Sequence, residues 1–131
     1  MNYMDNSQKK ILIVEDDQFL REFYEELLKA EGYIIDSAPD GEIGLSKIQS
    51  NQYDLVLLDL MLPKKDGVQI LRDLKANPPK SSQLNVVVLT NLGQDAVIKD
   101  CFNLGANGYL IKSALNPDQV LTEVKSYLQK K

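Results

Sequence analysis

The sequence predicts an α/β fold in which five parallel strands form an open, doubly wound sheet with helices on both faces. Short apolar runs alternate with stretches of helical spacing five times along the chain. The runs are continuous in valine, isoleucine and leucine, which is typical of strands buried on both faces of a parallel sheet. The length of 131 residues excludes an eightfold barrel, which needs roughly 200 residues or more.

The expected strands share this apolar character, and a segment with helical periodicity follows each of them. The second run, directly after Gly32, is the weakest. The five runs cover residues 11–14, 33–35, 55–58, 86–89 and 109–111.

The first and last helices have the clearest signals. Apolar residues recur at i, i+3, i+4, i+7 and i+8 from Leu20 to Leu28, and Gly32 stands where a C-cap glycine belongs. Near the end of the chain, Asn116 is the expected N-cap and Pro117 the first helical residue of a segment with one apolar face.

Three further helices are expected between these two. One begins at Asp40 and is weakened by Gly44. The next ends at the Asn-Pro-Pro of residues 77–79, which cannot continue a helix. The last covers about residues 94–104 and closes on Gly105.

Composition excludes several classes of function. Fifteen basic and nineteen acidic residues give a net charge of −4, which argues against free-standing nucleic-acid binding. The chain has no histidine, so imidazole zinc sites and histidine bases are excluded. Its one cysteine, Cys101, cannot form an internal disulfide, and no apolar run approaches the roughly 18 residues of a membrane helix. We therefore expect a cytoplasmic protein with no membrane partner, with a flexible arm at residues 1–8 and one domain at residues 9–131.

Polar residues follow four of the five expected strands. Glu15 and Asp16 come directly after the first, Asp59 after the third, Thr90 after the fourth and Lys112 after the fifth. In open α/β sheets the ligand site lies beyond the carboxyl ends of the strands, so these side chains are expected to converge.

Each of these residues also has an ordinary structural interpretation. Asp16 or Asp17 could cap the first helix, Thr90 could end a strand with a turn hydrogen bond, and Lys112 could be a solvated charge. Asp59 is harder to explain this way, because it interrupts an apolar run and a buried carboxylate costs several kcal/mol unless it is compensated. The combination, and no single residue, favours a functional site.

The residue types narrow the chemistry of that site. Glu15, Asp16 and Asp59 supply hard oxygen ligands without histidine or cysteine, which favours Mg²⁺ or a similar ion. Carboxylates, a divalent metal, the Thr90 hydroxyl and the Lys112 ammonium together form a constellation suited to phosphoryl transfer, in which a carboxylate can be the nucleophile.

At these positions the chain resembles the receiver domain of two-component response regulators, over about residues 9–129. The resemblance implies a flavodoxin-like (βα)5 sheet of order 2-1-3-4-5. Five stretches carry it together, and each alone is weak. They are residues 11–17, 54–63, 66–67, 86–90 and 105–112.

The resemblance also assigns roles around the acidic residues. Asp59 matches the phosphoacceptor. Asp16 and Asp59 match direct Mg²⁺ ligands together with the backbone carbonyl of Met61, while Glu15 acts through water. Lys112 matches the lysine that binds the phosphoryl group.

Two further positions match the family's switch. Thr90 corresponds to the switch hydroxyl and Tyr109 to the switch aromatic residue. The chain departs from the family at Ser113, where a proline is usual, at Asn91, where a small residue is usual, and at 107–108, where many DNA-binding members are acidic.

The function that the resemblance implies is a phosphorylation-activated signalling switch. A sensor histidine kinase or a phosphotransfer protein donates the phosphoryl group to Asp59, and the output is a downstream protein or a phosphorylation-dependent homodimer, without direct nucleic-acid contact. Such a domain is not a dedicated enzyme. The alternative is a degenerate receiver that acts as a phosphorylation-independent interaction module.

Two other classes fit the sequence less well. A flavin-binding module needs a phosphate-cradling loop after the first strand, where the acids of residues 15–17 would repel the phosphate. An aspartyl phosphatase, by family resemblance, needs a second acid where Met61 stands.

Overall fold

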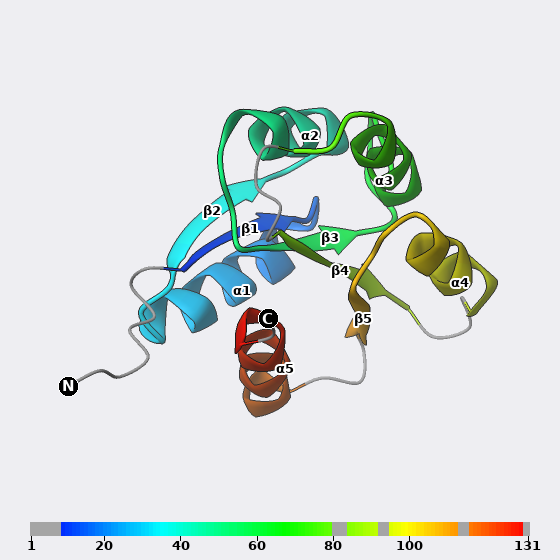
Figure 1. Cartoon of the computed structure of the whole chain (residues 1–131). Helices are drawn as coiled ribbons and strands as arrows, with labels where there is room; N and C mark the ends of the chain where they lie inside the picture. Colours follow the sequence, from blue (N-terminus) through cyan, green and yellow to red (C-terminus); the bar gives the residue numbers. More distant parts are fainter. Residues whose placement is uncertain (1–8, 80–83, 92–94, 113–115, 130–131) are drawn as a thin grey trace.

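The computed structural model describes residues 9–79, 84–91, 95–112 and 116–129. Within these ranges, strands and helices alternate along the chain as the sequence predicts (Figure 1). The elements are β1 (Lys10–Val14), α1 (Gln18–Ala30), β2 (Ile34–Ala38), α2 (Gly41–Ser50), β3 (Leu55–Asp59), α3 (Gly67–Ala76), β4 (Asn85–Thr90), α4 (Asp95–Asn103), β5 (Gly108–Ile111) and α5 (Pro117–Gln129). The predicted arm at residues 1–8 lies outside the described ranges, so the proposed domain boundary stays a prediction.

The strands form one parallel sheet of order β2-β1-β3-β4-β5, which confirms the predicted fold. Val14 pairs with Leu58, Asp59 with Leu89 and Thr90 with Ile111. Because every pair is parallel, the carboxyl ends of the strands lie at the same edge of the sheet. This edge receives the polar residues that follow the strands.

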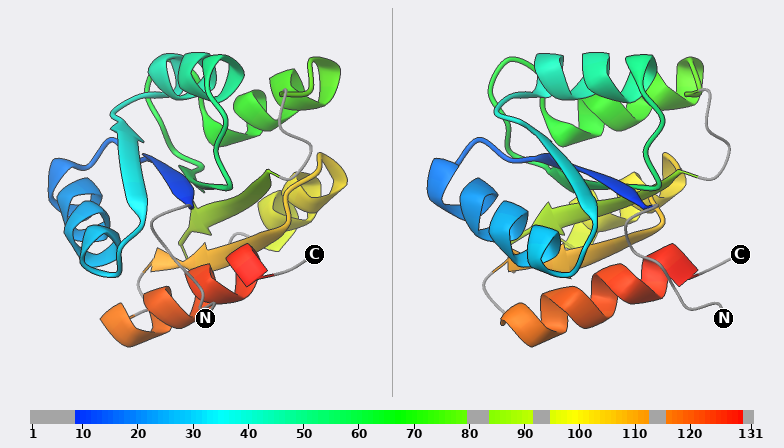
Figure 2. Two further views of the ribbon diagram at one scale, coloured as in Figure 1. Left: turned by 60° about the vertical axis from the view of Figure 1, so that its left-hand side comes forward. Right: turned by 90° about the vertical axis from the view of Figure 1, so that its left-hand side faces the viewer.

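Helices cover both faces of the sheet, with α1 and α5 on one face and α2, α3 and α4 on the other (Figures 1 and 2). The side chains of β1, β3 and β4 alternate between the two cores. Leu12, Val56 and Val88 enter the core under α2, α3 and α4, whereas Ile13 and Leu57 enter the core under α1 and α5. Burial on both faces explains why these strands are continuous apolar runs.

Side-chain caps fix the starts of the helices. The Asp17 carboxylate accepts the Leu20 N–H, so Asp17 is a helix cap. Asn116 caps α5 as predicted, through the backbone N–H of Gln119, and Asp40, the expected first residue of α2, is the cap of that helix, through the backbone N–H of Ile43. After the C-terminal end of α4, Gly105 adopts a φ of 105°, a left-handed conformation that glycine reaches without strain.

Two sequence expectations need correction. The second strand is expected at residues 33–35, but β2 covers Ile34–Ala38 and so extends further toward the C-terminus. The extension is missing from the prediction because β2 is an edge strand and its polar residues Asp36 and Ser37 give no apolar signal. Gly44 does not merely weaken α2: a Cβ at this position would lie 2.8 Å from Cγ1 of Val14. The glycine lets α2 pack closely on β1. Gln94, the expected start of α4, lies outside the described residues.

Hydrogen bonds between side chain and backbone close the amino-terminal edge of the sheet. Asp54 accepts the Lys10 N–H at 2.8 Å, and Asn107 accepts the Val86 N–H at 2.7 Å. The Asn85 side chain donates to the carbonyl of Tyr127 in α5 at 3.2 Å. None of the helices in the described ranges is long and apolar enough to span a lipid bilayer.

Candidate functional site

Three carboxylates converge at the carboxyl edge of the sheet. Glu15 and Asp16 follow β1, and Asp59 ends the neighbouring strand β3. One oxygen of each lies within 4.8 Å of the others. Glu15 is fully buried and Asp59 is 4% exposed, whereas Asp16 is open to solvent. The predicted acidic cluster is therefore present, with one of its carboxylates open to solvent.

Lys112 brings a positive charge to this cluster from the end of β5. Its Nζ lies 3.0 Å from Oε1 of Glu15 and 3.3 Å from Oδ2 of Asp59, and its side chain is 16% exposed. Burial alone would lower the pKa of Lys112, but the carboxylates of Glu15 and Asp59 outweigh burial and raise it. The lysine is therefore charged and aimed at the predicted phosphoacceptor.

The surroundings of the buried Glu15 carboxyl group disfavour its charged form. Burial raises the pKa of Glu15, and the neighbouring Asp59 raises it further, while Lys112 partly opposes both. Oε1 of Glu15 has the ion pair with Lys112 but no hydrogen bond among the described residues. A cation in the cluster would relieve the repulsion and satisfy this oxygen.

Arg21 supports the loop that carries the acids, although sequence reasoning did not select it. Its guanidinium donates to the backbone carbonyls of Glu15 at 2.8 Å and of Asp16 at 3.4 Å. The Asp17 N–H donates to Oε2 of Glu15 at 3.1 Å. The spacing is the one signal for this contact in the sequence: Arg21 stands one helical turn after the cap residue Asp17, so its side chain can reach back to the loop before the helix.

The backbone after Asp59 is tightly packed. The N–H of Met61 donates to Oδ1 of Asp59 at 3.3 Å, and the Met61 side chain is exposed. The N–H of Gly67 donates to the carbonyl of Leu60, and a Cβ on Gly67 would lie 2.7 Å from the carbonyl oxygen of Asp59. Glycine thus lets α3 start directly beside the acidic residue. The role of the Met61 carbonyl as a metal ligand stays a prediction.

The two expected switch residues lie on neighbouring strands. Thr90 is buried at the end of β4, and its hydroxyl donates to the carbonyl of Asn91 at 3.3 Å. Tyr109 on β5 is 42% exposed and packs edge-on against Phe102 of α4. Ser113, which replaces the family's proline, lies outside the described residues.

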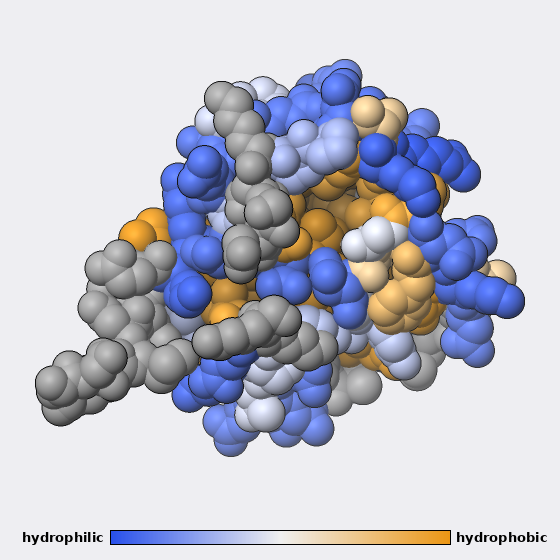
Figure 3. All heavy atoms as spheres, in the orientation of Figure 1, coloured by the Kyte–Doolittle hydropathy of each residue, from blue (hydrophilic) through white to orange (hydrophobic). Residues whose placement is uncertain are grey.

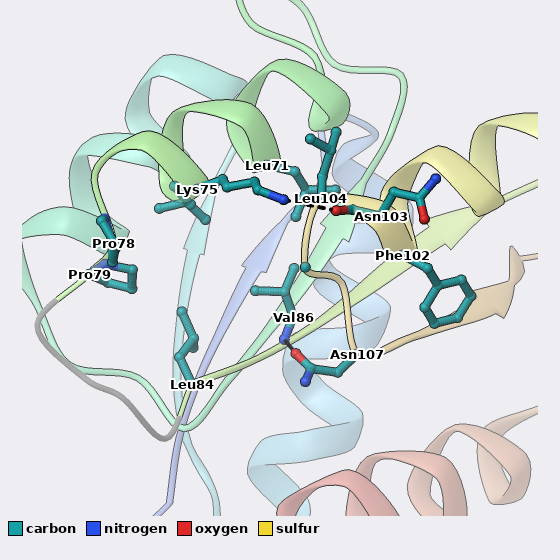
Figure 4. Close-up of a pocket in the computed structure, with 12 residues that line it drawn as sticks. Leu71, Lys75, Pro78, Pro79, Leu84, Val86, Phe102, Asn103, Leu104 and Asn107 are labelled. Atoms are coloured by element: carbon teal, nitrogen blue, oxygen red, sulfur yellow. Dashed lines mark hydrogen bonds between the residues drawn. The ribbon is translucent and has the colours of Figure 1, made fainter.

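A separate cavity of about 530 Å³ lies between α3 and α4, away from the acids. Figure 3 shows apolar side chains gathered in a hollow on this face, and Figure 4 shows the residues that line the cavity. Its lining is mostly apolar, with Lys75 of α3 donating to the carbonyl of Asn103 at 3.2 Å across it. Nothing in the cavity's lining belongs to the acidic cluster.

Comparison with known families identifies this arrangement. The family model described as the response regulator receiver domain matches residues 11–125. The chain belongs to this family. The match covers all three acids of the cluster together with Lys112, and no observation on the described residues of this receiver domain favours the degenerate alternative.

Individual relatives agree with the family assignment. The receiver domain is 37% identical over 122 residues to the response regulator ArlR of Staphylococcus saprophyticus, covering 92% of this chain and 53% of the relative. It is 33% identical over 127 residues to the transcriptional regulatory protein ResD of Bacillus subtilis, covering 95% and 50%. The chain thus spans about half the length of these curated relatives. A two-component response regulator from Clostridium difficile has a similar structure, with a TM-score of 0.83, 31% identity and coverage of 94% and 98%.

Proposed function

We propose that this receiver domain is a phosphorylation-activated switch of a two-component phosphorelay, in which Asp59 accepts the phosphoryl group while Mg²⁺ is bound. The observation that carries the proposal is the surroundings of Asp59. Its carboxylate is buried, two further carboxylates supply oxygens within 4.8 Å, and a lysine ammonium lies 3.3 Å away. A buried acid with these neighbours is suited to accept a phosphoryl group, because the carboxylates can bind a cation and the lysine can compensate the phosphoryl oxygens.

The donor atoms of the cluster fit a hard divalent cation. Glu15, Asp16 and Asp59 would hold the metal, with the backbone carbonyl of Met61 as a further ligand that the resemblance implies. When bound, Mg²⁺ neutralises oxygens of the transferring phosphoryl group. The exposed position of Asp16 gives the cation a path from solvent.

Each residue around Asp59 then has its own role in the transfer of the phosphoryl group. A carboxylate oxygen of Asp59 attacks phosphorus, the P–N bond of a phosphohistidine on the donor breaks, and the electron pair of that bond leaves with the imidazole nitrogen. Lys112 compensates the negative charge on the phosphoryl oxygens, and the N–H of Met61 holds the other side of the Asp59 carboxylate. The product is an acyl phosphate on Asp59.

The acyl phosphate would draw in the Thr90 hydroxyl and turn Tyr109 inward. Thr90 precedes α4 and Tyr109 lies on β5, so both residues report occupancy of the site to the face formed by α4, β5 and α5. A coupling of about 1–3 kcal/mol changes the affinity for a partner by 5- to 150-fold.

The partners follow from this chemistry. The phosphoryl donor is a sensor histidine kinase or a phosphotransfer protein, and the reader of the output face is a downstream protein or a second copy of the domain. The net charge of −4 argues against direct nucleic-acid contact by this domain. The domain assists its own phosphorylation in the cytoplasm and is not a dedicated enzyme.

Intact mass spectrometry tests the proposal. Wild type, Asp59→Asn and the control Asp118→Asn, which removes an exposed acid of α5, are treated with acetyl phosphate with and without Mg²⁺. We expect one phosphoryl group on wild type and on the control, and none on Asp59→Asn or without metal. Equal modification of all three proteins would overturn the assignment.

A further inference from the structure

The ring of Tyr109 leans on the ring of Phe102. The two ring centroids lie 6.2 Å apart and the ring planes cross at 86°, which is the edge-to-face geometry that aromatic pairs prefer. The contact joins α4 to β5, and Figure 4 shows the Phe102 side chain pointing from α4 toward β5. Phe102 is 44% exposed and Tyr109 is 42% exposed, so each ring shields part of the other from water.

The backbone under Tyr109 is held by α5. A Cβ on Gly108 would lie 1.8 Å from the hydroxyl oxygen of Tyr127, so this hydroxyl already occupies the space beside the strand. Burial raises the pKa of Tyr127, and a backbone hydrogen bond from Tyr109 to its hydroxyl partly opposes that rise. These contacts hold the β5 backbone against α5, so we expect a change at Tyr109 to be a rotation of its side chain.

The direction of that rotation follows from the strand register. Tyr109 pairs with Val88, whose side chain belongs to the core under α2, α3 and α4. Thr90 stands two residues after Val88, so its side chain has the same orientation. Tyr109 and Thr90 thus share one face of adjacent strands. In the proposed switch, an inward rotation would bring the Tyr109 ring toward Thr90 and out of its contact with Phe102.

We propose that Phe102 is a positioning residue that holds Tyr109 outward and so sets how readily occupancy of Asp59 turns the switch. The inference rests on the proposed function, because it uses Thr90 and Tyr109 as switch residues. An edge-to-face pair shifts an equilibrium between two orientations by roughly 2- to 12-fold. If the outward orientation of Tyr109 loses this contact, the inward orientation becomes more populated. A ligand that binds only the inward orientation then binds more tightly by the same factor.

The experiment measures binding of beryllofluoride, a mimic of the phosphoryl group, in the presence of Mg²⁺ by calorimetry. Phe102→Leu removes the ring and keeps a good helix former, while Phe102→Tyr keeps a ring. Phe19→Leu is the matched control, because Phe19 is 80% exposed and belongs to α1, the helix that covers the opposite face of the sheet. We expect about 2- to 12-fold tighter binding by Phe102→Leu, with Phe102→Tyr and Phe19→Leu equal to wild type.

A double-mutant cycle separates positioning from a general structural effect. In a Tyr109→Leu background the contact is already absent, so Phe102→Leu should leave the affinity for beryllofluoride unchanged. An unchanged or weaker affinity of Phe102→Leu alone, or an effect that persists without Tyr109, would overturn the inference. Wild type that fails to bind beryllofluoride would instead overturn the proposed function at Asp59.

Discussion

The ammonium group of Lys112 lies between the carboxylates of Glu15 and Asp59, at 3.0 Å from the first and 3.3 Å from the second. The residue that follows β5 thus faces the acid that follows β1 and the acid that ends β3. Because both acids are buried, their charges need compensation, and this one lysine faces both of them.

Replacing Lys112 should therefore separate metal binding from phosphorylation. Lys112→Met removes the positive charge beside the cluster, so the affinity for Mg²⁺ should rise about tenfold by the loss of one repulsive interaction. The rate of phosphorylation by acetyl phosphate should fall, because the phosphoryl oxygens lose their cation. Calorimetry with Mg²⁺ and intact mass against time measure the two quantities. Lys99→Met, on the exposed side of α4, is the control. Rates of phosphorylation equal to wild type would contradict this role.

Asp16 should carry much of the metal affinity. Asp16→Asn removes one of three clustered carboxylates that an ion could bind, and the affinity for Mg²⁺ should fall about tenfold or more. Asp17→Asn is a close control, since it removes the same charge one residue away and an asparagine still caps α1. Titration calorimetry compares the three proteins. Equal losses in both variants would show a general effect of charge instead of ligation.

Met61 should slow the loss of the phosphoryl group. Its exposed, apolar side chain stands two residues after Asp59 and cannot orient an attacking water. We expect Met61→Asn to release phosphate several-fold faster than wild type, measured on purified phosphoprotein. Leu92, the second residue to which we assign this effect, lies outside the described residues. Release that is slower or unchanged in Met61→Asn would show that this account is wrong.

Asp36 should make the stability of the domain depend on acid pH. Its carboxylate accepts hydrogen bonds from Lys47 at 2.9 Å and from the Tyr53 hydroxyl at 2.7 Å. Burial raises the pKa of Asp36, but these bonds and one from the Ser37 N–H lower it more, so the net shift is downward. A lowered folded pKa contributes stability above the unfolded pKa, near 3.9, and this stability is lost as pH falls through the folded value.

We therefore expect Asp36→Asn to cost about 1 kcal/mol of unfolding free energy at pH 7, a modest value because the pair is partly solvated. The difference from wild type should shrink as pH falls below about 4. Urea titrations at pH 7 and pH 3 measure both effects, with Asp118→Asn as an exposed control. A difference that is constant over this range would argue against the charged form of Asp36 as its source.

The output face should respond to the phosphoryl mimic. Backbone NMR with Mg²⁺ and beryllofluoride should shift the amides of α4, β5 and the start of α5, because both switch residues adjoin these elements. The amides of α2 serve as an internal reference, since this helix packs on β2 and β1, at the other end of the strand order from β5. Shifts confined to the loops around Asp59 would rule this output surface out.

Local chemistry explains which parts of the fold were predictable from the sequence. Caps at Asp40 and Asn116 and the glycine at Gly105 act within a few residues, so their signals are readable in the chain. The central strands are readable because burial on both faces demands continuous apolar runs. The edge strand β2 was only partly predicted, because the solvent-facing side of an edge strand admits polar residues such as Asp36 and Ser37.

Long-range contacts between side chains are the features of the site that the sequence does not reveal. The acids, Thr90 and Lys112 could be predicted to converge because parallel strands end at one edge. The contact of Arg21 with the carbonyls of Glu15 and Asp16, and that of Phe102 with Tyr109, depend on side-chain directions that spacing does not determine. The same holds for Lys64, whose φ of 69° follows from the loop between β3 and α3 and not from its residue type.

Side-chain hydrogen bonds close the amino-terminal edge of the sheet, whereas the acids occupy its carboxyl edge. At the amino-terminal edge, Asp54 fastens β1 to the start of β3, Asn85 fastens β4 to α5, and Asn107 fastens the start of β5 to β4. These bonds join neighbouring elements at fixed points. The side chains that make these bonds lie at the opposite ends of the strands from the acidic cluster, so the sheet is closed without using any group of the cluster.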